Sequence, residues 1–183
     1  MCGIAGYINF NNQPVSKFIL EEMGRAIEHR GPDGEGYWLN NNVGIAHKRL
    51  SIIDLSDAGS QPMISKNKRF ILSYNGEIYN YRELRKILMK KGYFFSSQSD
   101  SEVVLNSLIE WGKNAIEKFN GMFAFALWDN EKKEFLIARD RYGIKPLYYS
   151  IQRNTFSFAS EQKSILKLNN FNRKIEHQAF VEY

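Results

Sequence analysis

The sequence predicts an α+β fold in which antiparallel β-sheet is covered on both faces and helices form the outer layers. Residues 122–128 (MFAFALW) are apolar on both alternating faces, so a strand there needs cover on both sides. Short strand-like segments joined by tight polar turns follow it, and short connections imply antiparallel pairing. Three helical segments with apolar faces precede it and can supply the outer cover.

The front of the chain predicts a strand, a helix and a hairpin. Residues 4–10 are mainly apolar and favour a strand, and Ser16 is placed to begin a helix. The apolar positions of that helix share one face, and they are Ile19, Met23, Ala26 and Ile27. A turn cluster, GPDG, follows at residues 31–34. Residues 36–39 and 43–47 then flank three asparagines, which is typical of a hairpin.

The rest of the chain predicts strands around two further helices. Residues 69–74 favour a strand. The pairs Asn80–Glu83 and Ser99–Glu102 have the spacing of capping boxes, so each pair predicts a helix start. The first of these helices is expected to end at Gly92 and to bury Tyr81, Leu84, Ile87 and Leu88. Short strands are expected at residues 135–139, 147–151 and 155–159.

The composition fits a cytoplasmic globular domain. Of 183 residues, 43% are hydrophobic, so the chain can bury a core and disorder is not expected. A single cysteine cannot form an internal disulfide, which suits a reducing compartment. No apolar run is long enough to span a bilayer, and no signal peptide is recognisable. The net charge of +5 is spread over solvated faces, so we expect no nucleic-acid partner, no membrane partner and no metal site.

Cys2 is that single cysteine, and it lies between Met1 and Gly3. Methionine aminopeptidases remove an initiator methionine when the next side chain is small, which would leave a thiol and an α-amine on one residue. A deprotonated thiol is a strong nucleophile, and an α-amine with a pKa of about 7.7–8.0 can accept its proton near neutral pH. One residue would then supply nucleophile and base. The alternative is a small residue that merely follows Met1.

Three other segments place polar residues beside the expected elements. Arg49 leads from a strand into a turn, Asn75 and Gly76 follow a strand, and Asp100 starts a helix. Each has an ordinary structural explanation. Arg49 can be a surface cation, Asn75-Gly76 a hairpin turn, and Asp100 a favourable charge at a helix N-terminus. The residues taken singly leave these explanations open.

Seven segments together carry a more specific signal. In chain order they are MCGIAGYI, HRGPDGEG, RLSIIDLS, NGEIYNY, SDSEVVL, GMFAFALWD and ARDRYGIKPLYY. This set resembles the class II glutamine amidotransferases, most closely the glutaminase domain of the glutamine-hydrolysing asparagine synthetases, from Met1 to about Glu161. The resemblance implies an N-terminal nucleophile hydrolase fold, a four-layer αββα sandwich with antiparallel sheets. It also implies an enzyme that hydrolyses the side-chain amide of glutamine to glutamate and ammonia for asparagine biosynthesis.

The resemblance implies the catalytic residues as well. Cys2 would be the nucleophile once Met1 is lost, with its α-amine moving the proton. The side-chain amide of Asn75 and the backbone N–H of Gly76 would form the oxyanion hole, and such neutral donors suit a transient oxyanion. His29 is an alternative base, as in Cys–His enzymes, although HRGP is more typical of a loop that organises the pocket.

The substrate-binding residues follow from the same resemblance. Arg49 would hold the α-carboxylate of glutamine, because a guanidinium can grip a carboxylate through two hydrogen bonds. Asp100, with Glu77, would hold the α-ammonium. The segment after Arg49 would line the pocket, namely Leu50, Ser51, Ile52 and Ile53.

The asparagine synthetases also carry a second domain, which adenylates aspartate with ATP and uses a phosphate loop containing Gly-Gly. No Gly-Gly pair occurs here. We therefore expect a glutamine amidotransferase type 2 domain at residues 1–161, and a linker with the start of a synthetase domain at residues 162–183. This chain would need no cofactor, and ATP and magnesium would belong to the missing domain. The expected partners are glutamine and the covalently following synthetase domain, and a homodimer is left open.

The end of the chain carries two further expectations. Ile175, Phe180 and Val181 favour a helix that begins near Glu176. If a synthetase domain follows, its docking patch is expected around residues 147–149, parts of 156–159, and the tail residues Phe180 and Val181. Two alternatives to the asparagine synthetase reading remain. One is the glutaminase domain of another amidotransferase. The other is a non-catalytic glutamine-binding domain, against which Cys2 argues.

Overall fold

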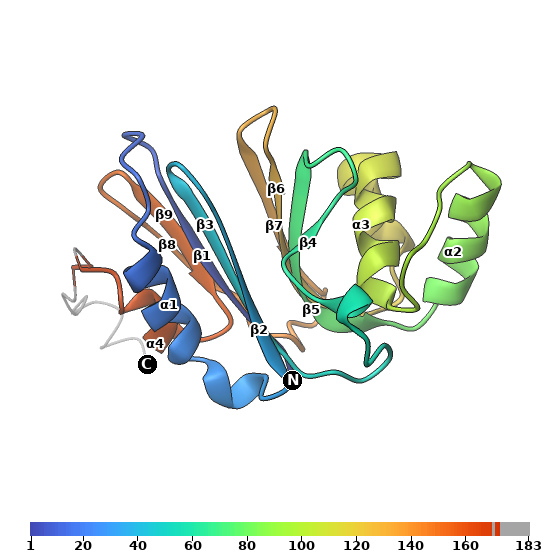
Figure 1. Ribbon diagram of the computed structural model, residues 1–183, viewed down its shortest axis with the longest axis horizontal. Helices are drawn as coiled ribbons and strands as arrows, with labels where there is room; N and C mark the ends of the chain where they lie inside the picture. Colours follow the sequence, from blue (N-terminus) through green and yellow to red (C-terminus); the bar gives the residue numbers. More distant parts are fainter. Residues whose placement is uncertain (170, 173–183) are drawn as a thin grey trace.

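The computed structural model describes residues 1–169, 171 and 172, which form four layers (Figure 1). Two antiparallel sheets face each other in the middle and helices cover their outer faces. The predicted α+β sandwich is therefore confirmed. Within the described part of the chain, no helix has the length and apolar character needed to cross a membrane. The helix expected near Glu176, with Phe180 and Val181, lies outside the described residues.

The first sheet has the strand order β2-β3-β1-β9-β8, and all its pairs are antiparallel. Its strands are β1 (Gly3–Asn9), β2 (Gly34–Asn40), β3 (Val43–Arg49), β8 (Tyr148–Gln152) and β9 (Thr155–Ala159). The strand that begins the chain therefore lies in the centre of the sheet, between β3 and β9. Both neighbours hold it in register, with Ala5 opposite Ala46 on one side and Ala159 on the other.

The second sheet has the order β4-β5-β6-β7. Its strands are β4 (Met63–Ile64), β5 (Phe70–Ile78), β6 (Gly121–Asp129) and β7 (Glu134–Arg139). The strand predicted to end at Tyr74 continues to Ile78, so the hairpin-turn explanation of Asn75-Gly76 is wrong. Both residues are inside β5, opposite Ala124 and Phe123 of β6. A Cβ on Gly76 would lie 2.5 Å from the Met122 carbonyl oxygen, so the sheet accepts only glycine there.

The helices lie as the amphipathic patterns predict, with two differences in detail. Helices α1 (Lys17–Arg25) and α4 (Gln162–Ile165) cover the first sheet, and α2 (Tyr81–Lys90) and α3 (Asp100–Trp111) cover the second. Ser16 and Ser99 cap α1 and α3. Asn80 does not cap α2, because its side chain bonds instead to the backbone before β6, at Lys118 and Asn120. Ile87, predicted to be buried, is 47% exposed.

Three apolar layers hold the sandwich together. One lies between the sheets and contains Ile4, Ala124, Ala126 and Phe158. A second packs the first sheet against α1, and a third packs the second sheet against α2 and α3. Along β1, Ile4 faces the layer between the sheets while Ala5 and Tyr7 face α1. This alternation determines where the residues at the start of β1 point.

The described end of the chain packs on the first sheet. Ile165, Leu168 and Phe171 join the apolar cluster of α1, so the described part of the predicted linker is packed on the domain. The domain boundary after Glu161 stays a prediction. Of the expected docking patch, Tyr148 and Tyr149 are exposed, whereas Phe158 and Ala159 are buried.

Candidate active site

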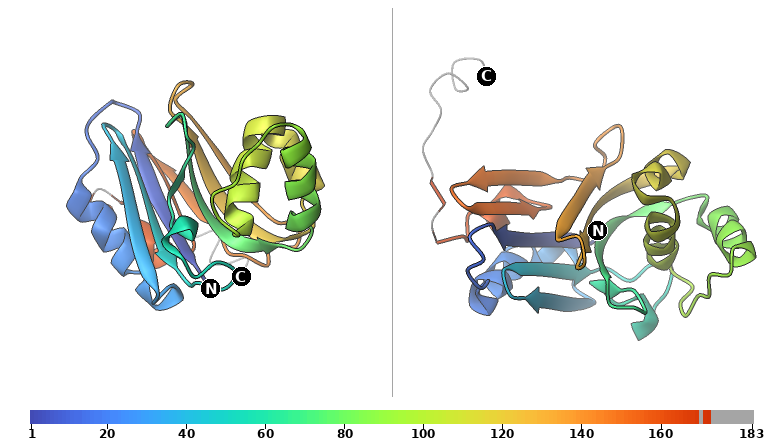
Figure 2. Two further views of the ribbon diagram at one scale, coloured as in Figure 1. Left: turned by 45° about the vertical axis from the view of Figure 1, so that its right-hand side comes forward. Right: turned by 90° about the horizontal axis from the view of Figure 1, so that it is seen from above.

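Cys2 lies just before β1, and the N-terminus is between the two sheets in all three views (Figures 1 and 2). Side chains alternate between the two faces of a strand, so Cys2 shares the inner face with Ile4. Its Sγ accepts a hydrogen bond from the Leu50 N–H (3.3 Å) and lies 3.5 Å from the Leu50 carbonyl oxygen. The thiol is therefore held against the segment that follows β3.

The thiol of Cys2 is free, and its surroundings do not favour the thiolate. Burial raises the pKa of Cys2, and the Leu50 hydrogen bond, the N-terminal charge and Arg49 offset this only in part. The thiol is therefore protonated at neutral pH, and a base must take its proton for it to attack as a thiolate. The α-amine of Cys2 itself is the base that removal of Met1 would provide.

In the described part of the chain, no strand pairs with the edge of β5 beside Cys2. The two-residue strand β4 pairs only with Ile71 and Leu72. Beyond them the side chain of Gln61 acts as a substitute for a strand, because its Oε1 accepts from the Tyr74 N–H (2.7 Å) and its Nε2 donates to the Tyr74 carbonyl (3.1 Å). Further along, the Ile78 N–H donates to Asp100 Oδ2 (3.0 Å). Residues 74 and 78 thus direct their N–H groups away from β6.

Gly76 lies midway between these two residues. In an extended strand, the N–H groups of alternate residues point to the same edge. The Gly76 N–H therefore points to the same open edge as those of Tyr74 and Ile78, away from the β6 ladder. Because Gly76 also lines the pocket that contains Cys2, its N–H is available to a ligand there.

Asn75 supplies a second donor from the same strand. It pairs with Ala124, which faces the layer between the sheets, so the Asn75 side chain lies on the inner face like Cys2. Asn75 is 2% exposed, and its Nδ2 is buried with no hydrogen-bond partner among the described residues. Buried amide donors are normally paired, so a donor left over beside a thiol suits a site that receives an oxygen.

Asp100 begins α3 and lines the pocket. Its Oδ2 accepts from the Tyr74 hydroxyl (2.7 Å) and from the Ile78 N–H, while no side chain among the described residues donates to Oδ1. Burial raises the pKa of Asp100, and its hydrogen bonds offset this only in part. A buried carboxylate with a free oxygen favours a cationic ligand. Glu77, one strand position after Gly76, lines the same pocket.

Arg49 ends β3 and is held by the loop that follows it. Its Nη2 donates to the carbonyl oxygens of Asp54 (2.5 Å) and Ser56 (2.9 Å). These contacts fix one side of the guanidinium and leave the other side to face the pocket. Ile52, on the same loop, lines the pocket and is 71% exposed, so this wall of the pocket faces solvent.

All the residues predicted for the site line a single pocket of about 240 Å³. They are Cys2, Arg49, Leu50, Ser51, Ile52, Ile53, Asn75, Gly76, Glu77 and Asp100. His29, the alternative base, does not line it, because its Nε2 contacts Glu161 Oε1 at 2.9 Å instead. No group of three or more His, Cys, Asp or Glu side chains that could hold a metal ion occurs in the described residues.

Sequence reasoning missed several residues of the pocket, including Gln61 and Lys145. Nothing in the sequence marks Gln61, since its role depends on a strand partner that is missing in space. Lys145 lies in the motif ARDRYGIKPLYY, and its loop is fastened by Asp140, which accepts from the N–H groups of Phe123, Tyr142, Ile144 and Lys145. The fixed loop brings a 6% exposed lysine to the pocket.

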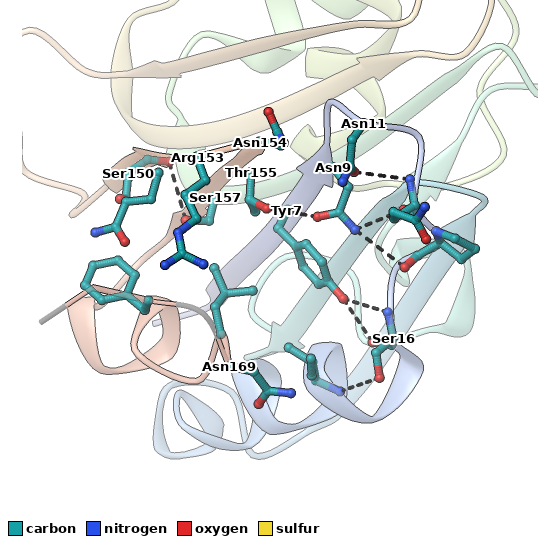
Figure 3. Close-up of a pocket in the computed structure, with 16 residues that line it drawn as sticks. Tyr7, Asn9, Asn11, Ser16, Ser150, Arg153, Asn154, Thr155, Ser157 and Asn169 are labelled. Atoms are coloured by element: carbon teal, nitrogen blue, oxygen red, sulfur yellow. Dashed lines mark hydrogen bonds between the residues drawn. The ribbon is translucent and has the colours of Figure 1, made fainter.

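A larger pocket, of about 420 Å³, shares no lining residue with the Cys2 pocket (Figure 3). It lies between the β8–β9 turn, the start of α1 and residues 168, 169 and 171, and its lining is mostly asparagine, glutamine and hydroxyl side chains. Arg153 is the one charged residue among those that line it. No nucleophile with a neighbouring base lines this pocket, so size alone does not locate the chemistry.

Comparisons with known proteins indicate the family of this chain. The family model described as "Glutamine amidotransferase domain" matches residues 1–183. Asparagine synthetase [glutamine-hydrolyzing] 3 of Bacillus subtilis is 38% identical over 185 residues, which covers 100% of this chain and 30% of that protein. Asparagine synthetase B [glutamine-hydrolyzing] of Escherichia coli is 41% identical over 169 residues, which covers 91% of this chain and 30% of that protein. The chain thus spans less than a third of the length of these relatives.

A solved structure supports the fold. The glutamine phosphoribosylpyrophosphate amidotransferase of Bacillus subtilis superposes with a TM-score of 0.76 and covers 90% of this chain and 43% of that one. The two sequences are 21% identical, so this likeness concerns the arrangement of sheets and helices alone.

Proposed function

Because the chain belongs to the family of glutamine amidotransferase domains, we propose that it hydrolyses the side-chain amide of glutamine in the Cys2 pocket. One observation carries this proposal. A free thiol at the second residue shares a pocket with the unpartnered side-chain N–H of Asn75 and with Gly76, whose backbone N–H points to the open edge of β5. A nucleophile opposite preorganised donors is the arrangement that acyl transfer needs.

The amino-acid end of glutamine is held by the charged residues of the pocket. Arg49 offers the free side of its guanidinium to the α-carboxylate. Asp100 offers Oδ1, which no described side chain contacts, to the α-ammonium, and Glu77 lines the same pocket. Leu50, Ser51, Ile52 and Ile53 form the wall between these groups and Cys2.

The chemistry begins when Met1 has been removed. The α-amine of Cys2 takes the thiol proton, and Sγ forms a bond to the amide carbon while Asn75 and Gly76 hold the oxyanion. The amine returns the proton to the leaving nitrogen, the C–N bond breaks, and ammonia departs from a γ-glutamyl thioester. Water attacks this thioester after giving a proton to the same amine. The C–S bond then breaks, glutamate leaves and the thiol is restored.

The ammonia is consumed, in this proposal, by an asparagine synthetase-like domain that follows residue 183. The full-length relatives are named as glutamine-hydrolysing asparagine synthetases, and this chain spans about 30% of their length. ATP and magnesium would act in that domain. The alternative acceptors are those of other amidotransferases. We place the protein in the cytoplasm, where a single cysteine stays reduced, and a homodimer stays a prediction.

Asn172, the last described residue, contacts the exposed strand β8. Gln152 of β8 clasps Asn172, since its Oε1 accepts from the Asn172 N–H (2.7 Å) and its Nε2 donates to the Asn172 carbonyl (3.3 Å). On the same strand Tyr149 and Ile151 are 66% and 65% exposed. Exposed apolar strand faces often mark interfaces, so we assign the docking of the following domain to this face.

The test is a product assay on the 183-residue chain with glutamine, aspartate, ATP and magnesium. We expect glutamate and ammonia, with no asparagine and no pyrophosphate. Cys2→Ala should lower the turnover by roughly 10⁴-fold or more, because it removes the nucleophile, while glutamine binding stays measurable by calorimetry. Full turnover by Cys2→Ala would contradict the proposal, and asparagine made by this chain would show that its chemistry is wider than proposed.

A further inference from the structure

A buried arginine connects the backbone of Cys2 to the side chain of Glu161. Arg30 ends a short 3₁₀ helix (Glu28–Arg30) after α1, and its side chain is only 9% exposed. Its Nε donates to the backbone carbonyl of Cys2 (3.0 Å), and its Nη1 donates to Glu161 Oε1 (2.9 Å). One guanidinium therefore bridges residue 2 and residue 161.

Glu161 is the centre of this contact set. It lies between β9 and α4, and besides Arg30 it contacts His29 Nε2 (2.9 Å) and Lys163 Nζ (3.0 Å). Burial alone would raise the pKa of Glu161, but the hydrogen bonds from Arg30, Lys163 and His29 lower it to about 2. Glu161 is thus a carboxylate at any working pH, and it holds the Arg30 guanidinium by a charge-assisted bond.

The neighbouring residue fixes the strand itself. Ser160 Oγ accepts from the Ile4 N–H (3.0 Å), and the Ser160 N–H donates to the Ile4 carbonyl (2.8 Å). Residues 160 and 161 therefore hold the start of β1 at two points. Ser160 holds Ile4 directly, and Glu161 holds Cys2 through Arg30.

Removal of Met1 makes the contact between Arg30 and the Cys2 carbonyl important. Cys2 then becomes the first residue, and chain ends fray unless they are tied down. Its α-amine has to stay free to move protons, so the carbonyl is the backbone group of Cys2 left for an anchor. Fixing the carbonyl limits how far the thiol can move from Leu50 and from the donors on β5.

We propose that Glu161 is a positioning residue for the nucleophile, which acts by holding Arg30 on the Cys2 carbonyl. This inference rests on the proposed function. It assigns to Glu161 no contact with substrate. Glutamine binding depends on Arg49 and Asp100, so loss of Glu161 should lower kcat and leave KM almost unchanged.

A purely structural ion pair would behave differently. If Glu161 only neutralised a buried arginine, its loss would leave fewer folded active sites, each with normal kcat. If it positions Cys2, every site persists and each one turns over more slowly. The number of sites can be counted by irreversible alkylation with 6-diazo-5-oxo-L-norleucine, a glutamine analogue with an electrophilic carbon, followed by intact-mass measurement.

The experiment compares Glu161→Ala, Glu161→Gln and the control Glu110→Ala in chains that lack Met1. Glu110 is matched in burial, with a 23% exposed side chain against 24% for Glu161, and in charge, since it pairs with Lys91. For Glu161→Ala we expect kcat per alkylated site to fall by about 10-fold to 10²-fold, the cost of a small misplacement of reacting groups. Glu161→Gln should recover part of the loss, because its amide oxygen can still accept from Arg30. Glu110→Ala should match the wild type.

Two results would overturn the inference while the proposed function stands. One is an unchanged kcat per alkylated site in Glu161→Ala, with the wild type active and Cys2→Ala inactive. The other is an equal loss in Glu110→Ala, which would show a general effect of removing an ion pair. A wild-type chain that does not hydrolyse glutamine would instead overturn the proposed function, and this inference with it.

Discussion

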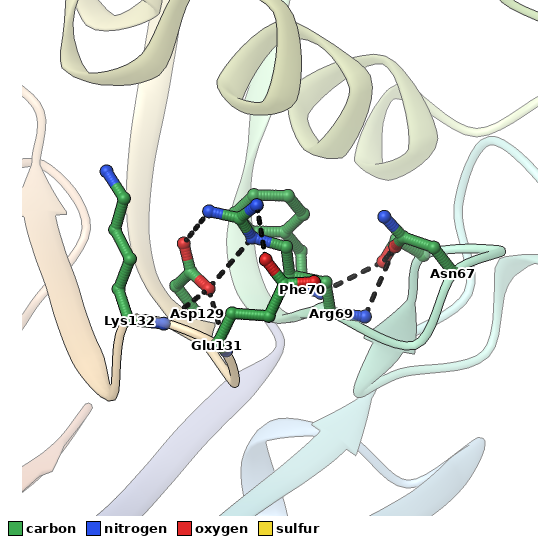
Figure 4. A network of polar contacts seen from close by, with 7 residues as sticks. Asn67, Arg69, Phe70, Asp129, Glu131 and Lys132 are labelled. Atoms are coloured by element: carbon green, nitrogen blue, oxygen red, sulfur yellow. Dashed lines mark hydrogen bonds and ion pairs between the residues drawn. The ribbon is translucent and has the colours of Figure 1, made fainter.

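A buried aspartate lies near each end of strand β5, and the two differ in the hydrogen bonds that their carboxylate oxygens accept. At the Phe70 end, Asp129 is 8% exposed and both its oxygens are occupied: Arg69 binds through Nε and Nη2, and the N–H groups of Glu131 and Lys132 donate to Oδ1 (Figure 4). At the Ile78 end, Asp100 is 5% exposed, and its side-chain and strand partners, Tyr74 and Ile78, both bond to Oδ2.

The pKa values follow this difference. Burial alone would raise the pKa of Asp129, but Arg69 and the backbone N–H groups bring it below the usual 3.8. The pKa of Asp100 is raised, because burial outweighs its hydrogen bonds and the nearby Glu77 carboxylate raises it further, whereas Asp129 has the charge of Arg69 beside it. Both carboxylate oxygens of Asp129 accept hydrogen bonds, which suits a residue that stabilises the fold. Asp100 keeps an oxygen that could bind a cationic ligand. The two aspartates are similarly shielded from solvent, so we assign their different roles from their hydrogen-bond partners rather than from burial.

The largest expected effect separates the two aspartates by the property each controls. Asp100→Asn should cost about 2–5 kcal/mol in kcat/KM for glutamine, since the α-ammonium loses its charged partner in a buried site. Asp129→Asn should leave kcat/KM within about twofold but lower the Tm. Steady-state kinetics and calorimetry on both variants test this pair.

A substrate analogue tests whether Asp100 binds the α-ammonium of glutamine. A γ-glutamyl amide that lacks the α-amine has no ammonium for Asp100 to hold. If the wild type hydrolyses this analogue as well as glutamine, Asp100 has no such role.

A smaller effect is expected at Asn75, in the same open end of β5. Asn75→Ala removes one of two oxyanion donors, so kcat should fall by roughly 10²–10³ with little change in KM. Kinetics over a full range of glutamine concentrations separate the two parameters. The reverse pattern, an intact kcat with a large rise in KM, would assign Asn75 to ground-state binding.

Arg49→Lys should have a more modest effect. Lysine keeps the charge but not the planar fork, so the α-carboxylate loses one charged hydrogen bond, and kcat/KM should fall by roughly 10-fold to 10²-fold. The loss should appear mainly in KM. A variant with unchanged KM would mean that Arg49 serves only the loop at Asp54 and Ser56.

The smallest effect is one of pH. Asp100 must be ionised to hold an ammonium, and its pKa is raised, so protonation begins at a higher pH than for an ordinary aspartate. As the pH is lowered, KM for glutamine should therefore rise at a higher pH than the one at which exposed aspartates become protonated. Asp100→Asn should lack this rise. An identical pH profile of KM in both proteins would contradict the assignment.

Much of this end of β5 could not be predicted from the sequence. Cys2 stands out by its position, and the layers follow from apolar patterns. The sequence predicts a strand that ends at Tyr74, and the Asn75-Gly76 pair after it is a common turn signal, yet the pairing with β6 continues to Ile78. The open edge exists because β4 is only two residues long. The length of β4 depends on how it pairs with β5 in space, which a local sequence pattern does not show.

Side-chain partners were also hard to predict. Glu102 has capping-box spacing, but its carboxylate bonds to Ser96 and Ser97 rather than to the Ser99 N–H. Asn80 likewise bonds across to Asn120. In both cases a local rule predicted the helix start correctly, while the side chain bonds to a different segment: the residues just before α3 for Glu102, and the distant residue Asn120 for Asn80. The bridge from Arg30 to Glu161 spans 131 residues, beyond the reach of any local pattern.

The central claim is that the chain works from a free α-amine on Cys2, and the most direct measurement compares two forms of one sequence. One form begins at Cys2 and the other retains Met1, each verified by intact mass. The account predicts glutamine hydrolysis and γ-glutamyl thioester formation only in the form that begins at Cys2, because a peptide nitrogen cannot accept the thiol proton. Equal turnover by the form that retains Met1 would contradict it.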